Sequence, residues 1–162
     1  MSEKKFVELA GKMLDEAKMK NLLEFSAFLK RNKLKKRNMG AKNLGVSYNS
    51  VDVCTVRLQE DFWLITYFKD YYNQAHLFNK CEEFFTGELK DFIISNINTV
   101  PGSVTGCKNC DIPKNKTIFG KSYDEVCNCH QIVIKNPCDK TLEYAKEIVI
   151  IAINTISNKE AN

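Results

Sequence analysis

The chain has 162 residues, of which 44% are hydrophobic and 27% charged, proportions typical of a globular protein and not of a disordered or coiled-coil chain. This length predicts a single domain, residues 1–162, that can bury a core of its own. The net charge of +4 is uneven, because residues 1–42 hold 12 Lys or Arg against 5 Asp or Glu and therefore carry +7. The basic character thus belongs to the N-terminal part.

No apolar segment has the form of a secretory signal, since Glu8, Gly11 and Lys12 interrupt the first hydrophobic stretch. The densest apolar run, residues 148–153, is far shorter than the roughly 18 residues that a membrane span needs. We therefore expect a cytoplasmic protein without membrane insertion.

The first half of the chain changes from a helical to a strand period. Residues 1–36 carry apolar residues at helical spacing and favour two helices with a break near residue 20, where Asn21 and Glu24 fit a capping box, over the alternative of one bent helix. Residues 44–68 then show three β-rich runs, 44–48, 51–58 and 62–68. Because the polar turns between these runs are short, they predict a three-stranded antiparallel meander.

The second half predicts one helix over residues 77–98, a cysteine-bearing loop over 99–116, and strand followed by helix over 117–157. The later strand is expected at 131–134, with a short one at 117–119 as a further candidate, and Asp139 is the expected N-cap of the last helix. Together the pattern predicts an α+β fold in which helices pack an antiparallel sheet of about four strands, the meander plus the later strand, with an N-terminal helical segment.

Two segments carry a resemblance, TIFGKSYDEVC at residues 117–127 and KNPCDKTLEYAKEI at residues 135–148. With the order of the elements, they resemble a family of small bacterial α+β proteins that has no assigned activity. The resemblance covers roughly residues 20–157, and it implies a fold but no function.

The most specific chemical pattern is a group of cysteines. Seven cysteines in a chain without an export signal are expected to be reduced thiols, so their spacing points to metal or redox chemistry. A C-x2-C turn places two sulfurs on one tetrahedral zinc ion, and a C-x-C-H segment follows it. The predicted zinc ligands are Cys107, Cys110, Cys127, and either Cys129 or His130.

Two other interpretations of the cysteines stay open. Inert cysteines explain the pattern as well as zinc does, while a redox pair is the weaker alternative, because the C-x2-C does not open a helix after a first strand. Cys54, Cys81 and Cys138 are expected to be structural.

A second pattern is a run of six basic residues within eight positions, a density that could bind phosphate backbones or an anionic membrane surface. Cations that collect at a helix C-terminus explain it more simply, so the sequence favours ordinary solvation over a nucleic-acid partner. The run comprises Lys30, Arg31, Lys33, Lys35, Lys36 and Arg37.

Aromatic residues near the end of the meander suggest a small-molecule pocket, although aromatics at these spacings more often form a plain core. The candidates are Trp63, Tyr67, Tyr71, Tyr72 and His76. No catalytic set accompanies them, so an enzyme is not favoured. The sequence does not establish a function, and its best interpretation is a binding or regulatory domain with a candidate structural zinc site. The alternatives are a small-molecule-binding or thiol-dependent enzymatic domain, and nucleic-acid binding through the basic run.

Overall fold

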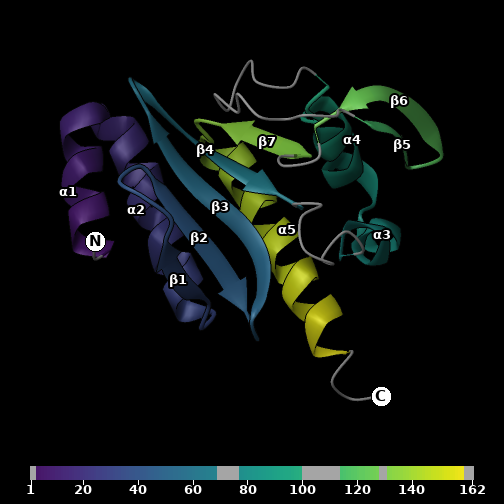
Figure 1. Ribbon diagram of the computed structural model, residues 1–162, viewed down its shortest axis with the longest axis horizontal. Coiled ribbons are helices and arrows are strands. Elements are labelled where there is room, and N and C mark those ends of the chain that lie inside the picture. The colour runs from purple at the N-terminus through teal and green to yellow at the C-terminus, as the bar shows by residue number, and fades with distance from the viewer. Residues whose placement is uncertain (1–2, 69–76, 100–113, 128–130, 159–162) are drawn as a thin grey trace. The chain divides into compact units, whose positions relative to one another are not determined.

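The computed structural model describes residues 3–68, 77–99, 114–127 and 131–158, shown as the coloured ribbon in Figure 1. The chain divides into two compact units, the first formed by residues 1–65 with 134–162 and the second by residues 66–133. Each unit is described by itself below. Among the described residues, no helix is both long enough and apolar enough to cross a membrane.

The described residues form an antiparallel five-stranded sheet, which confirms the predicted α+β fold and enlarges its sheet by one strand. The strand order is β1-β2-β3-β4-β7. The predicted meander corresponds to the three central strands, and the strand that the sequence did not predict is β1. The bounds are Lys35–Asn38 for β1, Asn43–Tyr48 for β2, Val51–Gln59 for β3, Phe62–Tyr67 for β4 and Ile132–Lys135 for β7.

Three helices belong to the first unit: α1 (Glu3–Met13), α2 (Glu16–Arg31) and α5 (Asp139–Ser157). Helix α1 contacts β2 and β3, while α5 contacts α2 and β3. Their apolar stripes lie in the core together with the sheet residues Leu44 and Val56, which are register partners on one face. The helices therefore hold the first three strands in place, and β1 follows directly from α2.

The break between the first two helices lies at Leu14–Asp15, so the prediction near residue 20 was wrong. Asp15 caps α2 by accepting a hydrogen bond from the backbone N–H of Lys18 at 2.9 Å. Asn21 lies inside α2, where its side-chain amide donates to the carbonyl oxygen of Pro137 at 3.1 Å. The capping-box pattern was therefore a false signal, and the amide serves to join α2 to the segment that enters α5.

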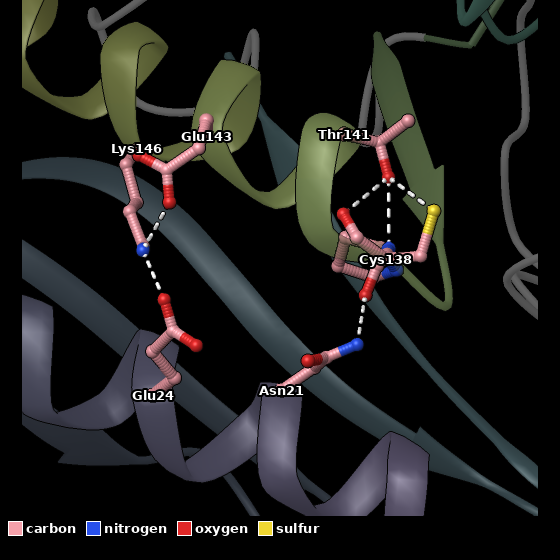
Figure 2. Close-up of polar contacts among 7 residues, drawn as sticks. Asn21, Glu24, Cys138, Thr141, Glu143 and Lys146 are labelled. Carbon is pink, nitrogen blue, oxygen red and sulfur yellow. Dashed lines mark hydrogen bonds and ion pairs between the residues drawn. The ribbon is translucent and has the colours of Figure 1, made fainter.

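Polar contacts connect α2 to α5 (Figure 2). Lys146, whose side chain is only 12% exposed, donates to Glu143 at 2.6 Å and to Glu24 on α2. At the start of α5, the backbone N–H of Cys138 donates to the hydroxyl of Thr141 at 2.8 Å, so Cys138 and not Asp139 is the N-cap. Burial alone would lower the pKa of Lys146, but its two carboxylate partners outweigh burial and raise it.

The ion pair predicts a pH-dependent contribution to stability. The hydrogen bond from Lys146 holds the pKa of Glu24 below its ordinary value, so the stabilisation is present at neutral pH and is lost as the pH falls through that lowered value. Glu24→Gln should reduce the free energy of unfolding by less than about 1 kcal/mol at pH 7, because the pair is partly exposed. Urea denaturation at pH 7 and pH 3 should show a larger difference at pH 7 than at pH 3. Glu147→Gln, an exposed change on α5, is the control, and an equal loss in both variants would contradict the expectation.

The second unit contains α3 (Leu77–Cys81), the 3-10 turn η1 (Glu82–Phe84), α4 (Gly87–Ser95) and a hairpin of β5 (Lys114–Ile118) and β6 (Lys121–Val126). The single helix predicted over 77–98 was wrong, because Phe85 and Thr86 are extended and Gly87 has a φ of +54°. The end of the predicted loop at 114–116 is part of β5, and the candidate strand at 117–119 belongs to the hairpin.

A cluster of phenylalanines fixes this hairpin within its unit. The turn at Phe119 and Gly120 has φ values of +51° and +73°, the left-handed pair that a two-residue hairpin turn requires. The ring of Phe119 contacts the rings of Phe78 and Phe85, with centroids 5.9 and 6.3 Å apart. Its backbone N–H donates to Glu82. The hairpin is therefore held at its turn.

Candidate functional site

The strongest candidate site is an open groove of about 810 Å³ in the first unit, hereafter the lysine groove. Three elements meet around it: the first turns of α1, the C-terminal end of α2, and β1 with the turn that precedes it. The lining residues are Glu3, Lys4, Val7, Glu8, Lys30, Lys33, Leu34 and Lys36. The structure thus brings together half of the predicted basic run, and it adds a lysine from α1.

The end of α2 positions two of these lysines. The N–H of Lys33 donates to the carbonyl of Lys30 at 3.0 Å, and the N–H of Leu34 donates to the carbonyl of Leu29 at 3.1 Å, which together form a Schellman motif. In this motif the residue after the cap has a left-handed conformation, usually that of glycine, and here Lys33 adopts it with a φ of +58°. The chain therefore reverses into β1 with Lys33 exposed at the groove.

The strand period divides the rest of the basic run between two faces. Lys36 pairs in register with Val46, on the sheet face that α1 and α2 cover. Lys35 and Arg37 have the opposite parity and lie on the other face, where the guanidinium of Arg37 is 3.7 Å from the carboxylate of Asp52. Only part of the predicted run can therefore act on one ligand, because a strand turns alternate side chains away from each other.

Lys36 has the most enclosed ammonium group of the groove, with a side chain only 8% exposed. It donates to the carbonyl oxygen of Ser26 at 3.0 Å and to the hydroxyl of Ser26 at 2.7 Å, and it forms an ion pair with Glu3. Burial would raise the pKa of Glu3, but hydrogen bonds from Lys36 and Ser26 lower it by more, so the carboxylate is ionised at neutral pH. The ion pair thus neutralises Lys36.

The net charge of the groove is positive. Four lysines against two glutamates leave two positive charges, and Lys4, Lys30 and Lys33 are exposed. Lys4 could not be predicted from the basic run because this residue precedes the run by 26 positions. The signal that could have found it is helical spacing, since Lys4 and Glu8 are one turn apart on α1, whose buried face carries Phe6 and Ala10.

The aromatic candidates fall into two groups. Trp63 and Tyr67 on β4 are fully buried, and the Trp63 ring lies against Phe25 with centroids 6.2 Å apart. Both residues thus pack as aromatic residues of a core do. The indole N–H of Trp63 has no hydrogen-bond partner among the described residues. Tyr71, Tyr72 and His76 lie outside the described residues. The pocket that the sequence suggests stays a prediction.

Most of the predicted zinc ligands also lie outside the described residues, namely Cys107, Cys110, Cys129 and His130. Cys127 is fully buried directly after β6, and its backbone N–H donates to the carbonyl of Asn98 at 2.9 Å. Within the part of the chain that the structure describes, no group of His, Cys, Asp or Glu side chains could hold a metal ion. The zinc site stays a prediction.

Metal content tests the zinc hypothesis directly. If the four ligands hold a structural site, protein purified without chelators should contain about one zinc ion per chain, and a chelator should lower its unfolding temperature. Cys107→Ser should remove the metal, whereas Cys54→Ser, at a buried strand position, should retain it. Elemental mass spectrometry gives the result, and metal-free wild-type protein would contradict the hypothesis.

The remaining cysteines of the described residues differ in exposure. Cys54 and Cys81 are buried, as structural cysteines are expected to be, while Cys138 is exposed at the N-cap of α5. The capping role of Cys138 accounts for its place in the fold.

Comparisons with protein-family models, with curated proteins and with solved structures found no match. The resemblance to a family of small bacterial proteins therefore stays a prediction.

Proposed function

We propose that the lysine groove of this protein binds the phosphate backbone of a nucleic acid. One observation carries the proposal: lysines from three separate elements converge on a single open groove. Lys4 comes from α1, Lys30 from the last turn of α2, and Lys33 from the turn before β1. If the lysines only interacted with the C-terminus of α2 and with solvent, there would be no reason for a lysine of another helix to lie beside them.

The position of Lys33 supports a role beyond solvation. A left-handed conformation costs a residue with a side chain roughly 1 kcal/mol relative to glycine, the usual residue at this position of a Schellman motif. Left-handed residues also form turns of this chain, at Ser50 and Phe119, so it is the exposed position of Lys33 beside the groove that favours a function for it. Lysine at this position lowers the stability of the fold relative to glycine, but it places a positive charge at the edge of the groove.

The lining of the groove indicates which part of a nucleic acid is bound. None of the described residues that line it is aromatic, so no platform for base stacking is present there. Lysines act as point charges and contact phosphates without reading base edges. The binding should therefore be independent of sequence.

The same lining favours nucleic acid over a membrane surface. Proteins that lie on anionic membranes combine cations with apolar side chains that enter the lipid. Among the described residues the exposed large hydrophobic side chains are Leu23, Met39 and Phe84, and none of them lines the groove. The proposed ligand is therefore the phosphate backbone of a duplex nucleic acid.

Salt dependence tests the proposal. Three exposed lysines that each neutralise one phosphate should give a slope of about −3 in a plot of log affinity against log salt concentration, because each contact releases condensed counterions. Fluorescence anisotropy of a labelled random duplex between 50 and 200 mM salt measures this slope. Anionic vesicles serve as the alternative ligand, and binding to the vesicles but not to the duplex would contradict the proposal.

Lys33→Gly separates function from folding. Glycine should relieve the left-handed strain and raise the free energy of unfolding by about 1 kcal/mol. The same change should weaken duplex binding about 3- to 10-fold and reduce the salt slope by about 1, because one phosphate contact is lost. Urea denaturation and the anisotropy titration give the two results.

Two variants control for each effect. Ser50→Gly also replaces a left-handed residue, with a φ of +66° in the β2–β3 turn, and should stabilise the protein without changing binding. Lys33→Gln should weaken binding without the stabilisation. A Lys33→Gly protein that binds duplex as the wild type does would contradict a role for Lys33.

A further inference from the structure

Two hydrogen-bond donors converge on one oxygen atom beside the lysine groove: Lys36 lines the groove, and Ser26 lies behind it in contact with Glu3 and Lys36. The Oε1 atom of Glu3 accepts from the hydroxyl of Ser26 at 2.9 Å and from the ammonium of Lys36. The same ammonium donates to the carbonyl oxygen of Ser26 at 3.0 Å, which fixes its position. The side chain of Lys36 is only 8% exposed, whereas Lys4, Lys30 and Lys33 of the same groove are exposed.

This pair of donors is suited to a phosphate oxygen. An ammonium and a hydroxyl that point at one position are common ligands of phosphate, and hydrogen bonds between ionised partners are roughly twice as strong as neutral ones. The donors belong to β1 and α2, whereas the acceptor that now occupies the position comes from α1. The donors are therefore set by the sheet and by α2, and the acceptor can be exchanged.

Glu3 is placed so that it can leave. It is the first residue of α1, and its side chain is 47% exposed. Helix ends fray, while α1 is anchored further along by Phe6 and Ala10, which are 3% and 0% exposed. Glu3 can therefore move away from Lys36 without loss of the apolar contacts that hold α1 on the sheet.

We propose that Lys36 and Ser26 form a phosphate subsite in which the Glu3 carboxylate is an internal occupant that a phosphate of the ligand displaces. The subsite rests on the proposed function, because the exposed lysines of the same groove bring the phosphate to it. Glu3 thereby weakens binding in the free protein. It also keeps the enclosed Lys36 charge paired until a ligand arrives, since an unpaired enclosed charge is unfavourable.

A charge-matched pair of variants tests this proposal. Glu8 lines the same groove on the next turn of α1, so Glu8→Gln and Glu3→Ala each remove one negative charge from it. Glu8→Gln should tighten duplex binding by no more than about 2-fold through long-range attraction. Glu3→Ala should tighten it about 5-fold and make the salt slope steeper by about 1, because Lys36 gains a phosphate contact. Adding Lys36→Met to Glu3→Ala should cancel the extra gain.

The outcomes separate the subsite from the proposed function. If the wild type binds duplex but both variants gain equally with an unchanged slope, the subsite is wrong and the proposed function stands. If no variant binds duplex, the proposed function is wrong, and the subsite is then tested with pyrophosphate as the ligand.

In that test, the NMR signal of the Lys36 ammonium is followed in Glu3→Ala as pyrophosphate is added. A shift that disappears when Ser26→Ala is added supports the subsite, and no shift overturns it. Unfolding midpoints of all variants confirm that each remains folded.

Discussion

The enclosed ammonium group of Lys36 is the constraint on which the groove depends. A charge with so little exposure must be paired and hydrogen-bonded, so α1, α2 and β1 have to meet where Glu3 and Ser26 reach it. That meeting point in turn sets where Lys4 and Lys33 lie, because both are within a few residues of the elements that it joins. In the free protein this polar contact joins the three elements around the basic surface, while apolar packing of Phe6 and Ala10 holds α1 on the sheet and remains when Glu3 moves away.

Much of the fold could be predicted from periodicity. The meander and the last helix appear close to their expected positions, because long alternating or helical patterns reflect the faces that are buried. Strand β1 could not be found in this way, since its sequence is Lys-Lys-Arg-Asn and has no apolar alternation. It forms because β2 offers it a hydrogen-bonding edge, a tertiary effect that local sequence does not report.

The candidate site was only partly accessible from the sequence for the same reason. A run of cations within eight residues reads as one patch, but the reversal at Lys33 and the period of β1 send Lys35 and Arg37 to the opposite face. Likewise, Lys4 joins the groove only through the packing of α1 on β2 and β3. Helix boundaries were the other weak point, since Asn21 has the right neighbour for a cap but lies in the middle of a helix.

Strand β1 is at the edge of the sheet, so the cations on the face away from the groove affect how this edge meets other chains. An outermost strand offers a template on which a second chain can add, and this is the usual route by which sheets join into aggregates. Lys35 is exposed on this strand, so two chains that approached edge to edge would bring like charges together, while Arg37 on the same face is paired with Asp52. The residues that the groove does not use are thus placed to oppose self-association at this edge, on the face opposite to the one for which we propose nucleic-acid binding.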